Sequence, residues 1–95
     1  MELSKMLIVS YDFSNDKVRT RFAKFLQRFG VRLQFSVFEL KNSQRILDLV
    51  LHEIESVYAP QFSNADSILI FNVLTQNVTK YGHAIHRDKS LVMLG

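Results

Sequence analysis

The 95-residue sequence contains no cysteine, which excludes a disulfide framework and a metal site built from thiolates. Its first residues lead straight into an apolar run and lack the hydrophobic core and cleavage site of a signal peptide. No apolar run approaches the length that a membrane-spanning helix needs. Internal repeats, low-complexity tracts and linkers are also missing from the sequence. We therefore expect one domain over residues 1–95 of a cytoplasmic protein.

The composition is that of a folded globule, because hydrophobic residues make up 47% of the chain and aromatic residues 12%. A chain of this length buries only roughly 60–65% of the surface that it exposes when unfolded. Its stability is therefore expected to gain from oligomerisation.

Positive charge is concentrated in the first half of the chain. The net charge is +3, yet residues 1–50 carry nine Lys or Arg against five Asp or Glu, whereas residues 51–95 carry three against four. A localised basic patch favours partners that bear phosphate groups. The same charges also suit an ordinary solvated helix face, so composition leaves both interpretations open.

The first 30 residues predict a strand followed by a basic helix. The strand, 6–11, stops at Asp12, and a short loop of cap-forming residues precedes a helix over 16–29. Gly30 is expected to end this helix in the left-handed conformation. Apolar residues recur along one side of the helix at helical spacing. The other side carries a basic row: Lys17, Arg21, Lys24 and Arg28, with Arg19 on the flank.

The segment 32–40 begins as an alternation of apolar and polar residues, with Phe35 on its apolar face, and then changes phase. This change predicts a bend near 36–38 and therefore two short strands. Ser43 is a natural N-cap for a second helix, which Pro60 ends. Residues 67–74 form the strongest strand, 75–82 are expected to contain a short helical turn, and 90–94 a last strand.

This order of elements predicts an α+β fold, a ferredoxin-like β-α-β-β-α-β sandwich with an extra C-terminal strand. Two helices can cover only one face of such a sheet, yet the strands 6–9 and 68–71 are apolar on both faces. The uncovered face must then be buried by another surface. A second copy is the simplest candidate, so we expect a two-fold homodimer.

Asp12 is the first candidate for chemistry because it ends a strand expected at the middle of the sheet. A carboxylate there suits Mg²⁺, and a two-fold dimer would supply a second one if this strand end faces the axis. From residue type alone, the commoner role is a turn residue that bonds its own backbone.

The loop 13–16 precedes a helix start, where free amides favour anions, and Lys17, Arg19 and Arg21 follow closely. This group suits a phosphodiester, although the loop contains no glycine and is no glycine-rich phosphate loop. Tyr11 and Ser36 have no adjacent base in the sequence, so we expect them to support a site rather than to react.

Four features of the region 7–40 occur together: Tyr11-Asp12 at a strand end, Asp16-Lys17 with Arg19 and Arg21, the segment 29–34, and the segment 36–39. With these features the region resembles the CRISPR-associated endoribonuclease family, the smaller of the two core CRISPR adaptation proteins. Each motif is weak alone, and together they are specific. The resemblance continues in the layout of the later elements and thus covers nearly the whole chain.

The resemblance implies a ferredoxin-like homodimer that joins two dimers of a larger CRISPR-associated integrase during spacer acquisition. It also implies basic residues that run along double-stranded DNA, matching Arg19 and Arg21, and an Mg²⁺-dependent nuclease on RNA or DNA in many members. The family's metal-binding aspartate matches Asp12, which would be both catalytic residue and metal ligand. The segment from Ser36 to Phe38 would lie near that site.

Three hypotheses follow. The first and leading one is a non-catalytic nucleic-acid-binding scaffold for spacer acquisition, with Lys17, Arg19, Arg21, Lys24 and Arg28 on the nucleic acid. The second, compatible with it, is a metal-dependent endonuclease that acts through Asp12, on single-stranded RNA among its substrates. The third, independent of the resemblance, is a ferredoxin-like ligand-sensing dimer without a nucleic-acid role. Salt-sensitive DNA binding separates the first from the third, because phosphate contacts weaken steeply with salt.

Overall fold

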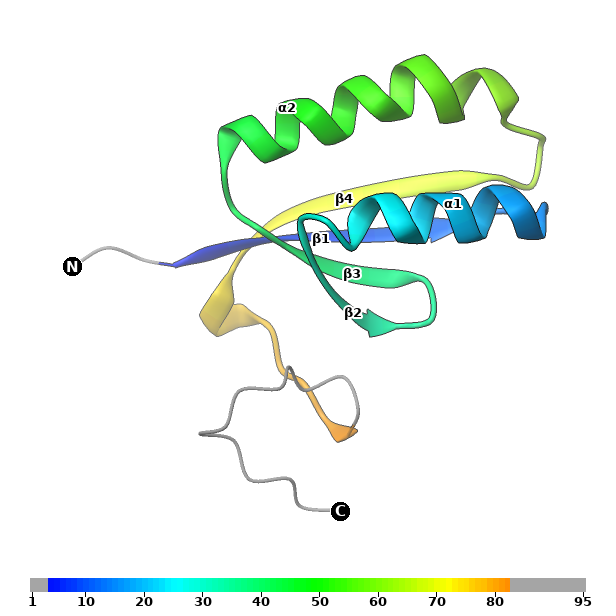
Figure 1. Ribbon diagram of the computed structural model, residues 1–95. Coiled ribbons are helices and arrows are strands. Elements are labelled where there is room, and N and C mark those ends of the chain that lie inside the picture. The colour runs from blue at the N-terminus through cyan, green and yellow to red at the C-terminus, as the bar shows by residue number, and fades with distance from the viewer. Residues whose placement is uncertain (1–3, 83–95) are drawn as a thin grey trace.

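The computed structural model describes residues 4–82. Its main elements follow the predicted order along the chain (Figure 1). They are β1 (Lys5–Asp12), α1 (Asp16–Leu26), β2 (Gly30–Gln34), β3 (Val37–Lys41), α2 (Gln44–Glu53) and β4 (Ser67–Leu74). The predicted last strand, 90–94, lies outside the described residues.

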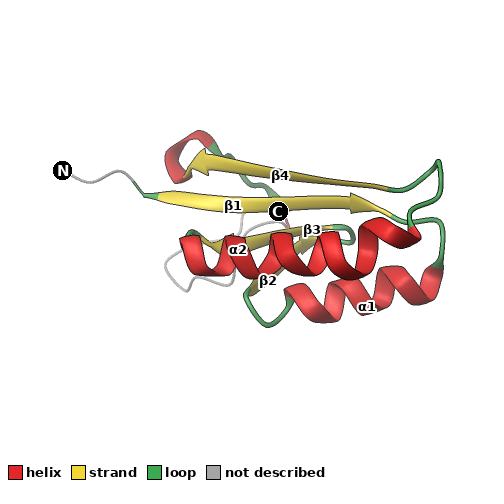
Figure 2. Ribbon diagram, turned by 90° about the horizontal axis from the view of Figure 1, so that it is seen from above, coloured by secondary structure: helices red, strands yellow, loops and turns green. Residues whose placement is uncertain are grey.

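The four strands form one antiparallel sheet in the order β2-β3-β1-β4. Strand β1 is therefore central, between β3 and β4. Helices α1 and α2 lie side by side on the same face of the sheet (Figures 1 and 2). This arrangement confirms the ferredoxin-like α+β prediction for the described part of the chain. No helix within residues 4–82 is long and apolar enough to cross a membrane.

Helix α1 begins where the cap residues predict and ends earlier than expected. The Asn15 side chain accepts a hydrogen bond from Val18 N at 3.0 Å, as an N-cap should. The helix ends at Leu26, and Phe29 N donates to Leu26 O at 2.9 Å in a tighter turn. The prediction of a helix to residue 29 was therefore three residues too long.

The predicted role of Gly30 as a left-handed helix cap was wrong. Gly30 is the first residue of β2, and Gly82 is the glycine with a positive φ in the described chain. Glycine is needed at position 30 because a Cβ atom there would lie 1.9 Å from the carbonyl oxygen of Glu39 on β3. Close approach of two strands, not backbone handedness, selects the residue.

Strands β2 and β3 form a hairpin, which confirms that the segment 32–40 holds two short strands. The turn comprises Phe35 and Ser36, and the pairing register shifts between Arg32 and Gln34. Phe35 therefore lies in the turn and is 68% exposed, so its expected place on an apolar strand face was wrong. The alternation failed there because a turn interrupts the pleat.

Helix α2 begins at the predicted cap, where the Ser43 hydroxyl accepts from Ile46 N at 3.3 Å. After Glu53 the helical path continues through a π-helical turn, Ile54–Tyr58, and a 3₁₀ turn, Ala59–Gln61. Pro60 sits within this last turn, close to the predicted end. The predicted short helical turn after β4 is also present, as a 3₁₀ turn at Thr75–Asn77.

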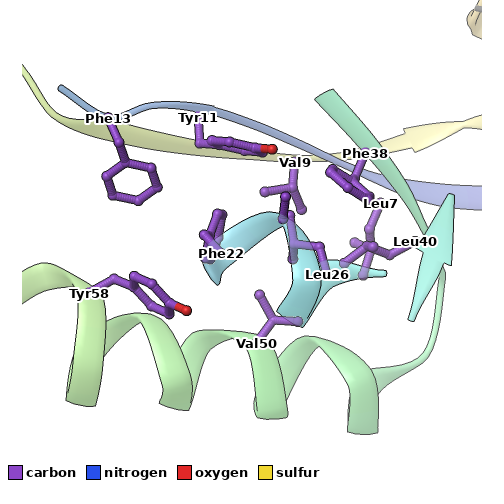
Figure 3. Packing of buried hydrophobic residues seen from close by; sticks show 11 residues of the cluster. Leu7, Val9, Tyr11, Phe13, Phe22, Leu26, Phe38, Leu40, Val50 and Tyr58 are labelled. Atoms are coloured by element: carbon purple, nitrogen blue, oxygen red, sulfur yellow. The ribbon is translucent and has the colours of Figure 1, made fainter. Parts of the chain in front are cut away.

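The hydrophobic core fills the space between the helices and the sheet (Figure 3). Its centre is the ring of Phe22, which packs edge-on against Tyr11 at 5.0 Å and Tyr58 at 4.8 Å between ring centroids. The rest of the cluster comes from β1, the loop that follows it, β3 and both helices: Leu7, Val9, Phe13, Ala23, Leu26, Phe38, Leu40 and Val50. Aromatic packing thus joins both helices to the central strand.

Neither α1 nor α2 covers the other face of the sheet (Figure 1). Leu69 and Phe71 on β4 are 55% and 47% exposed, and pair with Ser10 and Ile8 of β1. The chain after β4 passes over this side, where Lys80 Nζ lies 2.6 Å from Glu39 Oε1. Apolar β4 side chains on this face of the sheet are therefore exposed to solvent. We call the surface formed by Ile8, Leu69 and Phe71 the open face.

Candidate nucleic-acid interface

Asp12 lies exposed at the end of the central strand, as predicted. Side chains alternate along a strand, so Asp12 points to the opposite side from Tyr11, which belongs to the core. Asp12 thus shares its side of the sheet with Ser10 and with the open face. It borders a depression of about 590 Å³. The lining residues are Ser10, Tyr11, Asp12, Phe13, Arg19, Phe35 and Ser36, and we call this depression the Asp12 depression.

Tyr11 connects this depression to the core. Its side chain is only 3% exposed, and its hydroxyl donates to the carbonyl oxygen of Phe35 at 3.3 Å. Its backbone N–H donates to the carbonyl oxygen of Ser36 at 3.1 Å. Two hydrogen bonds from one residue therefore hold the β2–β3 turn beside Asp12. The role of Tyr11 and Ser36 in support of a site stays a prediction.

Phe38 lies deeper than the other predicted site residues. It is fully buried and pairs with Val9 on β1, so its ring belongs to the core. The guanidinium of Arg32, on the neighbouring strand β2, lies 5.2 Å from the Phe38 ring centroid. Phe38 therefore packs beneath the hairpin and beneath Arg32.

Arg19 is the basic residue that the structure brings to Asp12, since both line the same depression. Its Nη2 donates to the Phe13 carbonyl oxygen at 3.1 Å and lies 2.8 Å from Asp16 Oδ1. These contacts hold the half-buried guanidinium over the start of α1. Asp16 is engaged by Arg19 and does not line the Asp12 depression, so it is not brought to Asp12 as a second ligand.

The remaining predicted basic residues form a separate surface along α1. Lys17, Arg21 and Lys24 are exposed and border a shallow depression of about 440 Å³ with Asp16 and Thr20. Arg28 follows in the turn after the helix and is also exposed. We call the set Lys17, Arg21, Lys24 and Arg28 the basic row. Arg19 is on the flank of this row, as predicted, and faces the Asp12 depression instead.

Asp66 anchors the loop that follows Asp12, a role that sequence reasoning missed. Its Oδ1 accepts from Ser14 N at 2.9 Å and from Ser14 Oγ at 3.1 Å, and its Oδ2 accepts from Ser63 N at 3.0 Å. Backbone hydrogen bonds from Ser63 and then Ser14 lower the pKa of the Asp66 carboxyl. A turn-forming Asp before a strand was the only local signal, and it could not reveal a partner 52 residues away.

Mg²⁺ prefers oxygen ligands, retains several waters and is often held by one or two carboxylates. One copy of the chain offers Asp12 alone at this site, because residues 4–82 contain no cluster of three or more potential metal-binding His, Asp or Glu side chains. The exposed carboxylate fits this ion as one ligand among waters and substrate oxygens. A complete protein-derived ligand set would need Asp12 of a second copy.

A family model for CRISPR associated protein Cas2 matches residues 5–81 of the chain. A CRISPR-associated endoribonuclease Cas2 of Thermus thermophilus is 49% identical over 69 residues, which are 65% of this chain and 73% of that protein. The CRISPR-associated endoribonuclease Cas2 2 of Methanospirillum hungatei is 27% identical over 93 residues, which are 93% of this chain and 97% of that protein.

Solved structures agree with the sequence comparisons. The Streptococcus pyogenes Cas2 structure at pH 6.5 has a TM-score of 0.64 and 26% identity, covering 81% of this chain and 99% of that one. A hypothetical protein from Thermus thermophilus has a TM-score of 0.69 and 26% identity, covering 82% and 90%. The similarity thus extends across the sheet, both helices and the Asp12 depression.

Replacing Asp66 with Asn tests the anchor. The lowered pKa means that the charged carboxylate stabilises the fold above its unfolded pKa of about 3.8, and that this stability is lost as the pH falls through the lower folded value. We expect Asp66→Asn to be less stable than wild type in urea at about pH 7. The difference should shrink on acidification below pH 3.8. A difference that stays constant in acid would contradict the assignment.

Proposed function

The chain belongs to the CRISPR-associated Cas2 family, and from this premise we propose that it is a nucleic-acid-binding protein of CRISPR adaptation with metal-dependent endonuclease activity. The observation that carries the proposal is the family match over residues 5–81, which includes both the Asp12 depression and the basic row. Family membership does not favour the ligand-sensing alternative. We place the protein in the cytoplasm, where it would meet its nucleic-acid partners.

The proposed assembly is a homodimer that covers the open face. Leu69 and Phe71 leave about half of their surface in water, although they lie on the strand that pairs with the central strand β1. Burial of apolar surface stabilises association by about 25 cal/mol per Å² before the costs of binding are subtracted. Asp12 lies on the same side of the sheet, so a two-fold axis near the end of β1 would bring two carboxylates together.

The basic row is proposed to follow the phosphates of double-stranded DNA. Its members recur at intervals of three or four residues, so they lie along one side of α1 and its terminal turn. Lysine and arginine contacts to phosphate carry no sequence information and suit a scaffold that binds any duplex. In this role the dimer would present its DNA and its edges to dimers of the larger CRISPR-associated integrase.

The Asp12 depression is proposed to be the endonuclease site, with single-stranded RNA or DNA as the substrate. Asp12 would supply the charged oxygen ligand for Mg²⁺, and Arg19 would hold a phosphate oxygen of the scissile strand. Bound Mg²⁺ polarises the phosphodiester and makes a nucleophilic water available at neutral pH. Tyr11 and Ser36 keep the β2–β3 turn in place beside the two groups.

The homodimer is tested by measuring the mass of the protein in solution and by introducing a charged residue on the open face. Light scattering at micromolar concentration should report about twice the monomer mass of 11.1 kDa. Phe71→Lys should shift the protein toward the monomer, because a buried unpaired ammonium is strongly unfavourable. Leu51→Lys, on the exposed side of α2, is the control and should leave the mass unchanged. A monomeric wild-type protein at high concentration would refute the dimer.

The DNA surface is tested by the double variant Arg21→Glu with Lys24→Glu. Duplex affinity should fall, and the slope of log affinity against log salt should decrease by roughly 2, since each lost phosphate contact removes about 0.9. The matched control is Lys41→Glu with Arg45→Glu, which changes the net charge equally at exposed positions that are not members of the basic row. An equal loss of duplex affinity in both double variants would mean that net charge, and not the basic row, determines DNA binding.

The nuclease site is tested by Asp12→Asn, which preserves size and removes the charge that the ion needs. Cleavage of a single-stranded substrate in Mg²⁺ should fall by orders of magnitude, while the circular dichroism spectrum and dimer mass stay unchanged. Spacer acquisition should survive in the same variant, because bridging depends on the basic row and the dimer.

The matched control is Asp48→Asn, an exposed carboxylate on α2 that hydrogen-bonds Gln44 at 2.9 Å. It should retain cleavage. Persistent cleavage by Asp12→Asn would remove Asp12 as the metal ligand. Loss of acquisition in a folded, dimeric Asp12→Asn protein would mean that the acidic site, and not scaffolding alone, is required.

A further inference from the structure

Phe35 is an exposed aromatic ring in the turn of the β2–β3 hairpin, with two arginine guanidinium groups near it. Its side chain is 68% exposed. The Arg19 Cζ atom lies 5.7 Å from the ring centroid and the Arg32 Cζ atom 5.8 Å from it. We propose that Phe35 is a stacking platform for one unpaired nucleobase, with Arg19 and Arg32 on the adjoining phosphates. The inference rests on the proposed function and deepens it by assigning single strands to the Asp12 depression.

The position of Phe35 is fixed by hydrogen bonds to its backbone rather than by packing of its ring. Tyr11 Oη donates to the Phe35 carbonyl oxygen, and Tyr11 N donates to that of Ser36. The ring contacts that build the core join other aromatic residues, such as Phe13, Phe22 and Tyr58, and within residues 4–82 none includes Phe35. The fold therefore holds this turn firmly while leaving the ring accessible.

The surroundings of the ring suit a nucleotide. Unpaired bases stack on aromatic side chains and on the planes of arginine guanidinium groups, and every base offers such a face. Arg19 uses Nη2 for its contacts with Phe13 and Asp16, and a guanidinium carries five N–H donors. Among the contacts within residues 4–82, the Nε and Nη1 donors of Arg19 are not used, so they can donate to a phosphate. Arg32 is exposed and positioned by Phe38 below it.

The ring and the proposed nuclease site border the same depression. Asp12, Arg19 and Phe35 all line it, so a base stacked on Phe35 would lie at the depression that Asp12 also borders. A base in a duplex is stacked between its neighbours and has no free face to offer. Duplex DNA on the basic row and single strands in the Asp12 depression therefore use different chemistry.

The test measures binding by fluorescence anisotropy without divalent ions, so that cleavage does not interfere. The probes are a labelled oligouridylate, an abasic strand of the same length, and a DNA duplex. Phe35→Leu should weaken oligouridylate binding roughly 5- to 100-fold, the effect of losing one base–aromatic stack, and Phe35→Tyr should restore it. Binding of the abasic strand and of the duplex should not change.

The matched control is Tyr81→Leu, which removes an aromatic ring that is 83% exposed and has no arginine over it within residues 4–82. It should bind all three probes as wild type does. If Phe35→Leu failed to fold, the wild-type protein would still decide the matter, because stacking requires it to prefer the uridine strand over the abasic one. Equal wild-type affinity for these two strands would overturn the inference.

Other outcomes separate this inference from the proposed function. A wild-type protein that binds the duplex but not the oligouridylate would refute the stacking platform and leave the scaffold intact. A wild-type protein that binds none of the three probes would refute the proposed function itself. If Phe35→Leu changed the dimer mass and not the affinity for strands, Phe35 would be a protein contact and the inference would be wrong.

Discussion

The burial of Tyr11 is the constraint on which the site depends. Its ring packs against Phe22 in the core, while its hydroxyl and backbone amide hold the β2–β3 turn. Because side chains alternate along a strand, a buried Tyr11 forces Asp12 to the other side of β1, into solvent. One residue therefore couples the stability of the core to the positions of the carboxylate and of the exposed phenylalanine beside the Asp12 depression.

Helix α1 separates two kinds of basic residue. Arg19 is held through its Nη2 atom by the Phe13 carbonyl and by Asp16, and it lines the depression. The basic row lies along the helix surface, where its flexible side chains are exposed. A fixed guanidinium suits a defined phosphate near a reacting bond, whereas mobile charges suit a long, uniform phosphate backbone. The two proposed activities can thus occupy neighbouring surfaces of one small domain without competing for the same residues.

Much of the fold could be predicted because local patterns specify it. The caps at Asn15 and Ser43, the apolar periodicity of both helices and the two-sided apolar character of β1 and β4 all predicted elements that the structure contains. The predictions were wrong where a contact with a segment distant in the sequence determines the role of a residue. Gly30 is required by the carbonyl of Glu39 and not by the helix before it. Phe35 fits a strand pattern, and a turn held by Tyr11 places it in solvent.

The sequence by itself determined the order of elements, the basic side of α1 and the candidate carboxylate Asp12, because each depends on residues close together in the chain. Tertiary structure decided what surrounds that carboxylate. Asp66 reaches Ser14 across 52 residues, and Tyr11 reaches Phe35 across 24. Such contacts depend on strand order and register, which put β1 between β3 and β4. Local periodicity cannot encode them, since the energy that selects the register comes from packing the whole core at once.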